Sequence, residues 1–261
     1  MRNSKTRYLL ISFFCFASLE SFSENKIVDE RTGVEIIWSI DSSLFRKGSE
    51  YRAVILPDNH VQKACEMVVR ALRKYPDALL RKNLKKIYVM DSIKVNGFDW
   101  GGTYSAFPAA LYIIYDMNEL YSEQGIHHEF SSILLKNYPQ FFDREKWGRI
   151  NPAGFRYGGD GRKMIETGAK MSKQSEDLLR KGFVYQYSTA SVEEDFNCMA
   201  EQLFSPDTGF WKHIDQHKRL RKKALRAINF YRSITPFYDV RFFKVIIPSN
   251  SAEFLQDGFL K

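Results

Sequence analysis

The residues of this chain best suited to chemistry are His128 and Glu129, which are followed by Ser132 in the stretch His-Glu-Phe-Ser-Ser. In the pattern H-E-x-x-H, two histidines on one helix face bind one Zn²⁺ ion, and the glutamate activates the water that the metal holds. Ser132 stands where the second histidine would be. A serine hydroxyl is a weak, neutral zinc ligand compared with cysteine, histidine and carboxylate. The stretch therefore predicts a zinc-binding helix in which one ligand is replaced.

The elements around these residues follow from periodicity and turn signals. Residues 111–115 form the clearest apolar strand, and the helix that carries His128 begins shortly after them. Residues 143–168 are rich in Gly, Pro and Asn, which predicts a long loop of the kind that tends to be functional. A second helix is predicted over residues 192–203, because Ser191 and Glu194 form a capping box. By itself, the acidic start of that helix is explained by the helix dipole.

Taken together, these residues resemble the zinc peptidases related to anthrax lethal factor and the Pro-Pro endopeptidases, together with bacterial zinc-binding metallopeptidases. The resemblance is carried by His128-Glu129-Phe130, by Tyr187 and by Glu194-Asp195-Phe196, within roughly residues 87–204. In that family a His-Glu-Phe sequence opens the active-site helix, and a tyrosine seven residues before the glutamate ligand faces the metal. Tyr187 stands seven residues before Glu194.

The resemblance implies His128 and Glu194 as zinc ligands, Glu129 as the general base and Tyr187 as the donor to the oxyanion. It implies that residues 111–115 are the edge strand along which an extended peptide substrate pairs. It also implies a zincin-like, gluzincin-type α+β fold. In such a fold a mixed sheet lies beside the active-site helix, and a helical C-terminal lobe forms the far wall of a cleft.

Two departures from the family pattern fall on the metal site. Ser132 replaces a histidine, and Cys198 stands where relatives commonly carry a glutamate that supports a ligand. Glu201 is a candidate to take over that support. In one arrangement the ion is held by His128 and Glu194, and Ser132 or a water molecule takes the place of the second histidine.

Other arrangements stay open. His127 is adjacent, but one residue turns a helix by about 100°, so it could contribute only from an irregular helix start. His213 and His217 have a spacing that permits chelation, although the cations around them favour two surface histidines. The remaining possibility is a pseudoenzyme that keeps the cleft and has lost the metal.

The chain begins with the features of a secretory signal peptide. Arg2, Lys5 and Arg7 precede an apolar run over residues 8–17, and a cut is expected after Ser23. Residues 1–23 are therefore predicted to be a leader and residues 24–261 a metallopeptidase-like domain that is secreted or periplasmic. The run is too short to span a bilayer, and we expect no integral membrane segment once it is removed. Cys65 and Cys198 then remain, as one disulfide or as two buried thiols.

The formal net charge is +8, and much of the excess lies in residues 212–232. Leu220, Ala224, Ile228 and Tyr231 recur there at helical spacing, so we expect one basic helix whose cations form the solvated face. Nucleic-acid binding is not expected, because aromatic interleaving and a recognisable motif are missing from this tract.

The sequence thus favours an exported zinc-dependent metallohydrolase, a peptidase in which Glu129 acts as general base and whose partner is a peptide or protein substrate. The alternative is a catalytically inactive peptidase-like module that binds an extended peptide or cell-surface polymer. A third and weaker interpretation is an electrostatic adaptor that works through residues 212–232.

Overall fold

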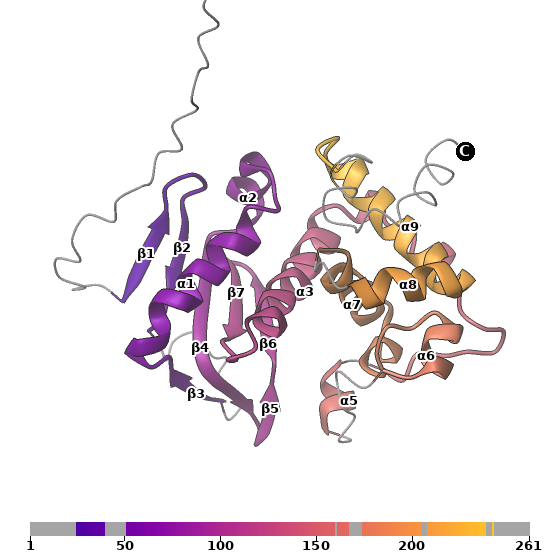
Figure 1. Cartoon of the computed structure of the whole chain (residues 1–261), viewed down its shortest axis with the longest axis horizontal. Helices are drawn as coiled ribbons and strands as arrows, with labels where there is room; N and C mark the ends of the chain where they lie inside the picture. The colour runs from indigo at the N-terminus through magenta and orange to yellow at the C-terminus, as the bar shows by residue number, and fades with distance from the viewer. Residues whose placement is uncertain are drawn as a thin grey trace, which may run out of the picture.

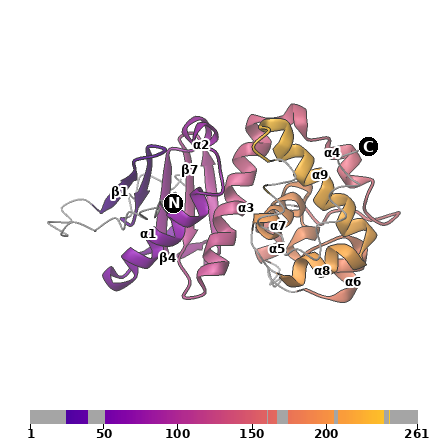
Figure 2. The ribbon, with the colours of Figure 1, turned by 45° about the horizontal axis from the view of Figure 1, so that its top comes forward.

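The computed structural model describes residues 25–39, 51–159, 161–166, 174–204, 208–238 and 242. A sheet with helices packed on it and a lobe of helices lie side by side, as Figure 1 shows. Helix α3 (Glu119–Asn137) lies between these two parts in both Figure 1 and Figure 2. The predicted leader, residues 1–23, lies outside the described residues. Among the helices that the structure describes, none is long and apolar enough to cross a membrane.

The sheet is mixed, with seven strands in the described residues. Its main path runs in the order β1-β2-β4-β7-β6. Strand β4 pairs in parallel with β2 and β7, whereas the pairs β1–β2 and β6–β7 are antiparallel. Strands β3 and β5 pair with the C-terminal part of β4. The bounds are Lys26–Asp29 (β1), Val34–Ile37 (β2), Tyr51–Ile55 (β3), Lys86–Val95 (β4), Phe98–Trp100 (β5), Gly102–Ala106 (β6) and Ala109–Ile114 (β7).

The prediction that residues 111–115 form the edge strand is wrong. Leu111 in β7 pairs with Ile87 of β4 on one side and with Tyr104 of β6 on the other, so β7 is internal. On this side of the described sheet, the edge strand is β6. Its sequence, Gly-Thr-Tyr-Ser-Ala, lacks the apolar run by which β7 is recognised. This pattern is expected for a strand that is half-exposed at an edge.

The core lies where the sheet is covered by α1 (Asp58–Leu72) and α3. Strand β4 alternates between its two faces, so Ile87 and Val89 point into the main core and Tyr88 and Met90 into a second cluster on the opposite face. The predicted fold class, α+β with a mixed sheet, is confirmed. The short helix α2 (Asp77–Asn83) follows α1 and packs against α3.

The second part of the molecule consists of helices around α7. Helix α3 packs along α7, and α7 in turn contacts α9. The predicted loop over 143–168 contains two short helices, α4 and α5. The bounds are Pro139–Phe141 (η2), Arg144–Gly148 (α4), Gly161–Glu166 (α5), Glu176–Lys181 (α6), Tyr187–Thr189 (η3), Val192–Phe204 (α7), Thr208–Gln216 (α8) and Lys218–Ile234 (α9).

The basic tract is two helices rather than one, because His217 adopts an extended conformation between α8 and α9. The four apolar positions of α9 are fully buried as predicted: Leu220, Ala224, Ile228 and Tyr231. Lys223, which we expected on the solvated face, is also fully buried. Its ammonium group pairs with Asp195 of α7 at 2.6 Å, and this partner explains how a cation is tolerated in the interior.

Candidate metal centre

A cavity of about 400 Å³ lies between α3, α7 and the edge strand β6. All five site residues predicted from the sequence line it: His128, Glu129, Ser132, Tyr187 and Glu194. Further walls come from β5 and from α5, and these two elements contact each other. The structure therefore brings together residues from the first helix, the second helix and the segment between them.

His128 is 7% exposed and points from α3 toward α7. Its Nε2 atom lies 2.9 Å from Oε2 of Glu194, and its Nδ1 atom contacts Oε1 of Glu201. The imidazole is thus held between two carboxylates of one helix. The Cys198 side chain also forms a hydrogen bond with the ring. Burial lowers the pKa of His128, but Glu201, Cys198 and Glu194 raise it by more, so the pKa lies well above its usual value.

Glu129 follows His128 and faces the same cavity. Burial raises its pKa to about 8, and nearby Glu194, Glu201 and Glu193 add to the rise, against the opposing effect of His128. A carboxyl group with a pKa near neutrality is suited to take up and return a proton during one reaction cycle. Gly102 of β6 lies close by, since a Cβ atom on it would be 3.4 Å from Oε1 of Glu129. The edge strand and the carboxyl group are therefore adjacent.

Ser132 is 1% exposed, and its hydroxyl is occupied by other side chains. Nδ2 of Asn197 donates a hydrogen bond to it at 2.7 Å, and the hydroxyl of Tyr104 also bonds to it. The Tyr104 hydroxyl in turn donates to Oε1 of Glu193 at 2.9 Å. Ser132 thus joins α3 to α7 and to the edge strand.

Tyr187 lies in η3 with its ring centroid 6.0 Å from that of His128. Burial raises the pKa of its hydroxyl far above the usual value, so the hydroxyl keeps its proton and can donate it in a hydrogen bond. Gly161, the first residue of α5, lies against this group. A Cβ atom there would overlap both the Tyr187 hydroxyl and the Glu194 carboxylate. Only glycine fits at this position without displacing them.

The donors in the cavity are of the types that zinc uses in proteins. An imidazole, a thiol and a carboxylate converge in His128, Cys198 and Glu201, whose ligand atoms all lie within 4.8 Å of one another. Glu194 adds a second carboxylate at the other ring nitrogen. The residues present therefore fit a divalent ion.

A family model matches residues 83–241 of the chain. The family is described as "Putative zinc-binding metallo-peptidase". The chain belongs to this family. No curated protein and no solved structure matches the chain. The matched residues run from the end of α2 through α9 and so include every residue of the candidate metal centre.

Membership of the metallopeptidase family agrees with the zinc and hydrolase chemistry predicted from His128 and Glu129. The kinship to lethal factor and the Pro-Pro endopeptidases stays a prediction. Neither His127 nor the pair His213 and His217 joins the candidate metal centre. His127 points away from the cavity, where its Nδ1 atom bonds to the Tyr75 hydroxyl at 2.7 Å. His213 and His217 stack on each other at 6.1 Å and lie outside the residues that line the cavity.

For two residues of the candidate metal centre, the sequence did not predict a role as metal ligand. Cys198 was noted as the replacement of a glutamate that supports a ligand, and Glu201 as the residue that could take over this support. Cys198 and Glu201 lie three residues apart on α7, a spacing that places both on one helix face, and this spacing was the available signal. Cys198 carries a free thiol, as does Cys65 in α1, so of the two alternatives left open by the sequence the structure has two thiols and not a disulfide. The contribution of Gly161 was not foreseen, since a glycine in a Gly-rich segment carries no distinct signal.

Proposed function

We propose that this metallopeptidase-family protein is an exported zinc-dependent peptide hydrolase whose active site is the cavity around His128. The observation that carries the proposal is the adjacency of His128 and Glu129 on α3, both facing a cavity lined by donors that suit zinc. Two arrangements place an ion on His128: at Nε2 with Glu194 and Ser132, or at Nδ1 with Cys198 and Glu201. In both, Glu129 and Tyr187 face the same cavity.

A bound Zn²⁺ ion would polarise the scissile carbonyl and make water more acidic. Glu129 acts as the general base that takes a proton from the attacking water and then gives it to the leaving amine. Its position next to His128 at the cavity supports this role. The Tyr187 hydroxyl donates a hydrogen bond to the oxygen on which negative charge develops, an interaction made mainly in the transition state.

The edge strand β6 supports a peptide as the substrate class. Its outer edge is unpaired among the described strands, and residues Gly102, Thr103 and Tyr104 line the cavity. An extended peptide can add to such an edge through main-chain hydrogen bonds, which places one peptide bond beside the catalytic groups. This strand takes the place that the sequence had assigned to residues 111–115.

The test is a Glu129→Gln variant of the full chain, produced without a histidine tag and compared with the exposed-site control Glu145→Gln. Glu129→Gln should lower the hydrolysis of a peptide library by at least about 100-fold, while metal analysis finds the same zinc content as in the wild type. Hydrolysis that persists in Glu129→Gln would show that the base is misassigned. A protein that takes up no zinc but binds extended peptides would support the inactive binding module instead.

A further inference from the structure

The imidazole of His128 has a carboxylate at each nitrogen, and these two carboxylates cannot have the same role. Glu194 contacts Nε2 and Glu201 contacts Nδ1. A single ion takes only one nitrogen of an imidazole, and the other N–H of a metal-bound histidine is normally held by a carboxylate or carbonyl. One glutamate is therefore a ligand, and the other orients the ring.

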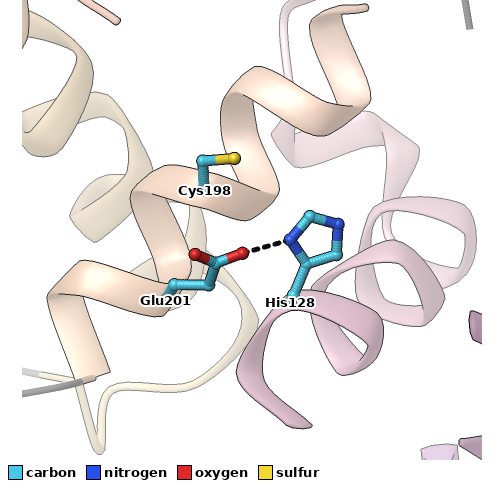
Figure 3. A group of neighbouring side chains, drawn as sticks. All are labelled: His128, Cys198 and Glu201. Atoms are coloured by element: carbon cyan, nitrogen blue, oxygen red, sulfur yellow. Dashed lines mark hydrogen bonds and ion pairs between the residues drawn. The ribbon is translucent and has the colours of Figure 1, made fainter. Parts of the chain in front are cut away.

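Besides Glu194, two donors of α7 accompany the His128 ring: Glu201, whose carboxylate contacts Nδ1, and Cys198. Cys198 and Glu201 project from one face of α7 toward His128, as Figure 3 shows. The three ligand atoms lie within 4.8 Å of one another. Donors around one zinc ion are roughly 3–4 Å apart, since the bonds are about 2.0–2.3 Å long and tetrahedrally arranged. Small side-chain movements would thus suffice to enclose an ion here.

The carboxylate at Nε2 is that of Glu194, and the Ser132 hydroxyl, which stands where the second histidine would be, is already hydrogen-bonded. Ser132 accepts a hydrogen bond from Asn197 and bonds to Tyr104, so recruiting it would break contacts between α3, α7 and the edge strand. A serine hydroxyl is also a poor zinc ligand. Ser132 therefore does not replace the lost histidine as a ligand.

We infer that the ion is bound at Nδ1 of His128 by the Cys198 thiolate and the Glu201 carboxylate, and that Glu194 is a positioning residue that holds Nε2–H. This inference rests on the zinc binding of the proposed function. Three protein ligands leave the fourth position open, as in catalytic zinc sites. Cys198 binds as the thiolate, and its proton passes to solvent when the ion binds. The thiolate thus supplies the strong ligand that the chain lacks at Ser132.

The test uses Co²⁺ as a probe of the full chain, because a thiolate bound to cobalt gives a charge-transfer absorption in the near ultraviolet. We expect this band in the wild type and in the matched control Cys65→Ser, and its loss in Cys198→Ser. Glu201→Gln should abolish uptake of the ion. Glu194→Gln should keep the band and bind cobalt about 10–100-fold more weakly, as expected for a residue that orients a ligand.

A measurement on the wild type makes the result independent of how the variants fold. X-ray absorption of the zinc-loaded protein should find one sulfur at about 2.3 Å from the metal. Metal without a sulfur neighbour, or uptake that depends on Glu194 but not on Glu201, would overturn the inference and leave the proposed function standing. A sulfur ligand in a protein that hydrolyses no peptide would overturn the proposed function alone. A wild type that binds neither ion would overturn both.

Discussion

The ammonium group of Lys223 donates a hydrogen bond to Oδ2 of Asp195 at 2.6 Å, and neither side chain is exposed to solvent. The same oxygen accepts hydrogen bonds from Trp147 Nε1 at 2.8 Å and from the Tyr157 hydroxyl at 2.7 Å. Asp195 directly follows Glu194. These contacts of Asp195 therefore fix the first turn of α7 against α4, α9 and the segment that leads to α5. Because Glu194 lies in the same turn, they also fix its position at the candidate metal centre.

We expect Lys223→Met to destabilise the protein strongly, because it leaves the Asp195 carboxylate buried without its cation. Breaking one partner of a buried pair costs about 3–5 kcal/mol. Urea denaturation measures this loss, and Lys222→Met, an exposed neighbour on the same helix, is the matched control. Equal unfolding midpoints for the two variants would mean that the pair contributes little to stability.

Lys223 also illustrates what the sequence of α9 could and could not predict. Its position, three residues after Leu220 and next to Ala224, places it on the apolar face by helical geometry. We assigned it to solvent because an unpaired cation is too costly to bury. The assignment failed because the partner of Lys223, Asp195, is on another helix. A contact between two helices produces no repeating pattern in the sequence.

The same distinction applies to the metal centre. The roles of His128 and Glu129 were predicted from the His-Glu pattern and its resemblance to the zinc peptidases, and both residues line the cavity. The convergence of Cys198 and Glu201 on His128 depends on how α3 packs along α7, which no local pattern specifies. The edge strand was misplaced for a related reason, since the apolar run of β7 marks burial and therefore an internal strand.

Gly161→Ala tests the close approach of α5 to the active site. The added methyl group would overlap the Tyr187 hydroxyl and the Glu194 carboxylate, so α5 or these groups must move. We expect kcat/KM for peptide hydrolysis to fall by about 100-fold, the size of effect that a displacement of about 1 Å can have. Zinc content should stay unchanged if Glu194 orients the ring and does not bind the ion.

The matched control is Gly148→Ala in α4, where a Cβ atom meets nothing within 4 Å. This variant should keep the wild-type activity. Similar activities of the two variants would contradict the proposed role of Tyr187, since its hydroxyl could then move without loss.

Ser132→His restores the histidine of the H-E-x-x-H pattern, but the site has little room for it. Ser132 is buried and bonded to Asn197, so we expect the single variant to lose about 1–3 kcal/mol of stability through overpacking. Combining it with Asn197→Ala makes space for the ring. In the double variant we expect zinc affinity to rise at least tenfold, about 1.4 kcal/mol, because an imidazole joins the Nε2 side.

The cobalt spectrum of this double variant indicates where the ion lies. An ion that moves to Nε2, Glu194 and the new imidazole should lose the thiolate absorption of Cys198. Higher affinity with an undiminished thiolate band would instead show that the new imidazole binds the ion together with Cys198. Asn197→Ala alone is the control, and we expect it to keep the wild-type affinity and band.

His127 should make the stability of the protein depend on pH. It is fully buried, stacks on Phe204 and bonds to the Tyr75 hydroxyl. Burial lowers its pKa to about 4, and nearby Glu123 offsets only part of this effect. The unfolded chain therefore binds a proton near pH 6.5, where the folded protein does not. Because the unfolded state binds more protons in this range, stability falls as the pH falls toward 4.

Urea denaturation at about pH 7 and about pH 5 should find a loss of about 2 kcal/mol from this group, since each pKa unit corresponds to about 1.4 kcal/mol. Glu123, whose pKa is lowered below its usual 4.5, stays ionised in the folded protein across this interval. His127→Gln keeps a group that can bond to Tyr75 but cannot take up the proton, so its stability should change less between the two pH values. Because His128 is common to both proteins, the difference between their pH dependences isolates His127. Parallel pH dependences would mean that His127 is protonated in the folded state, which its burial opposes.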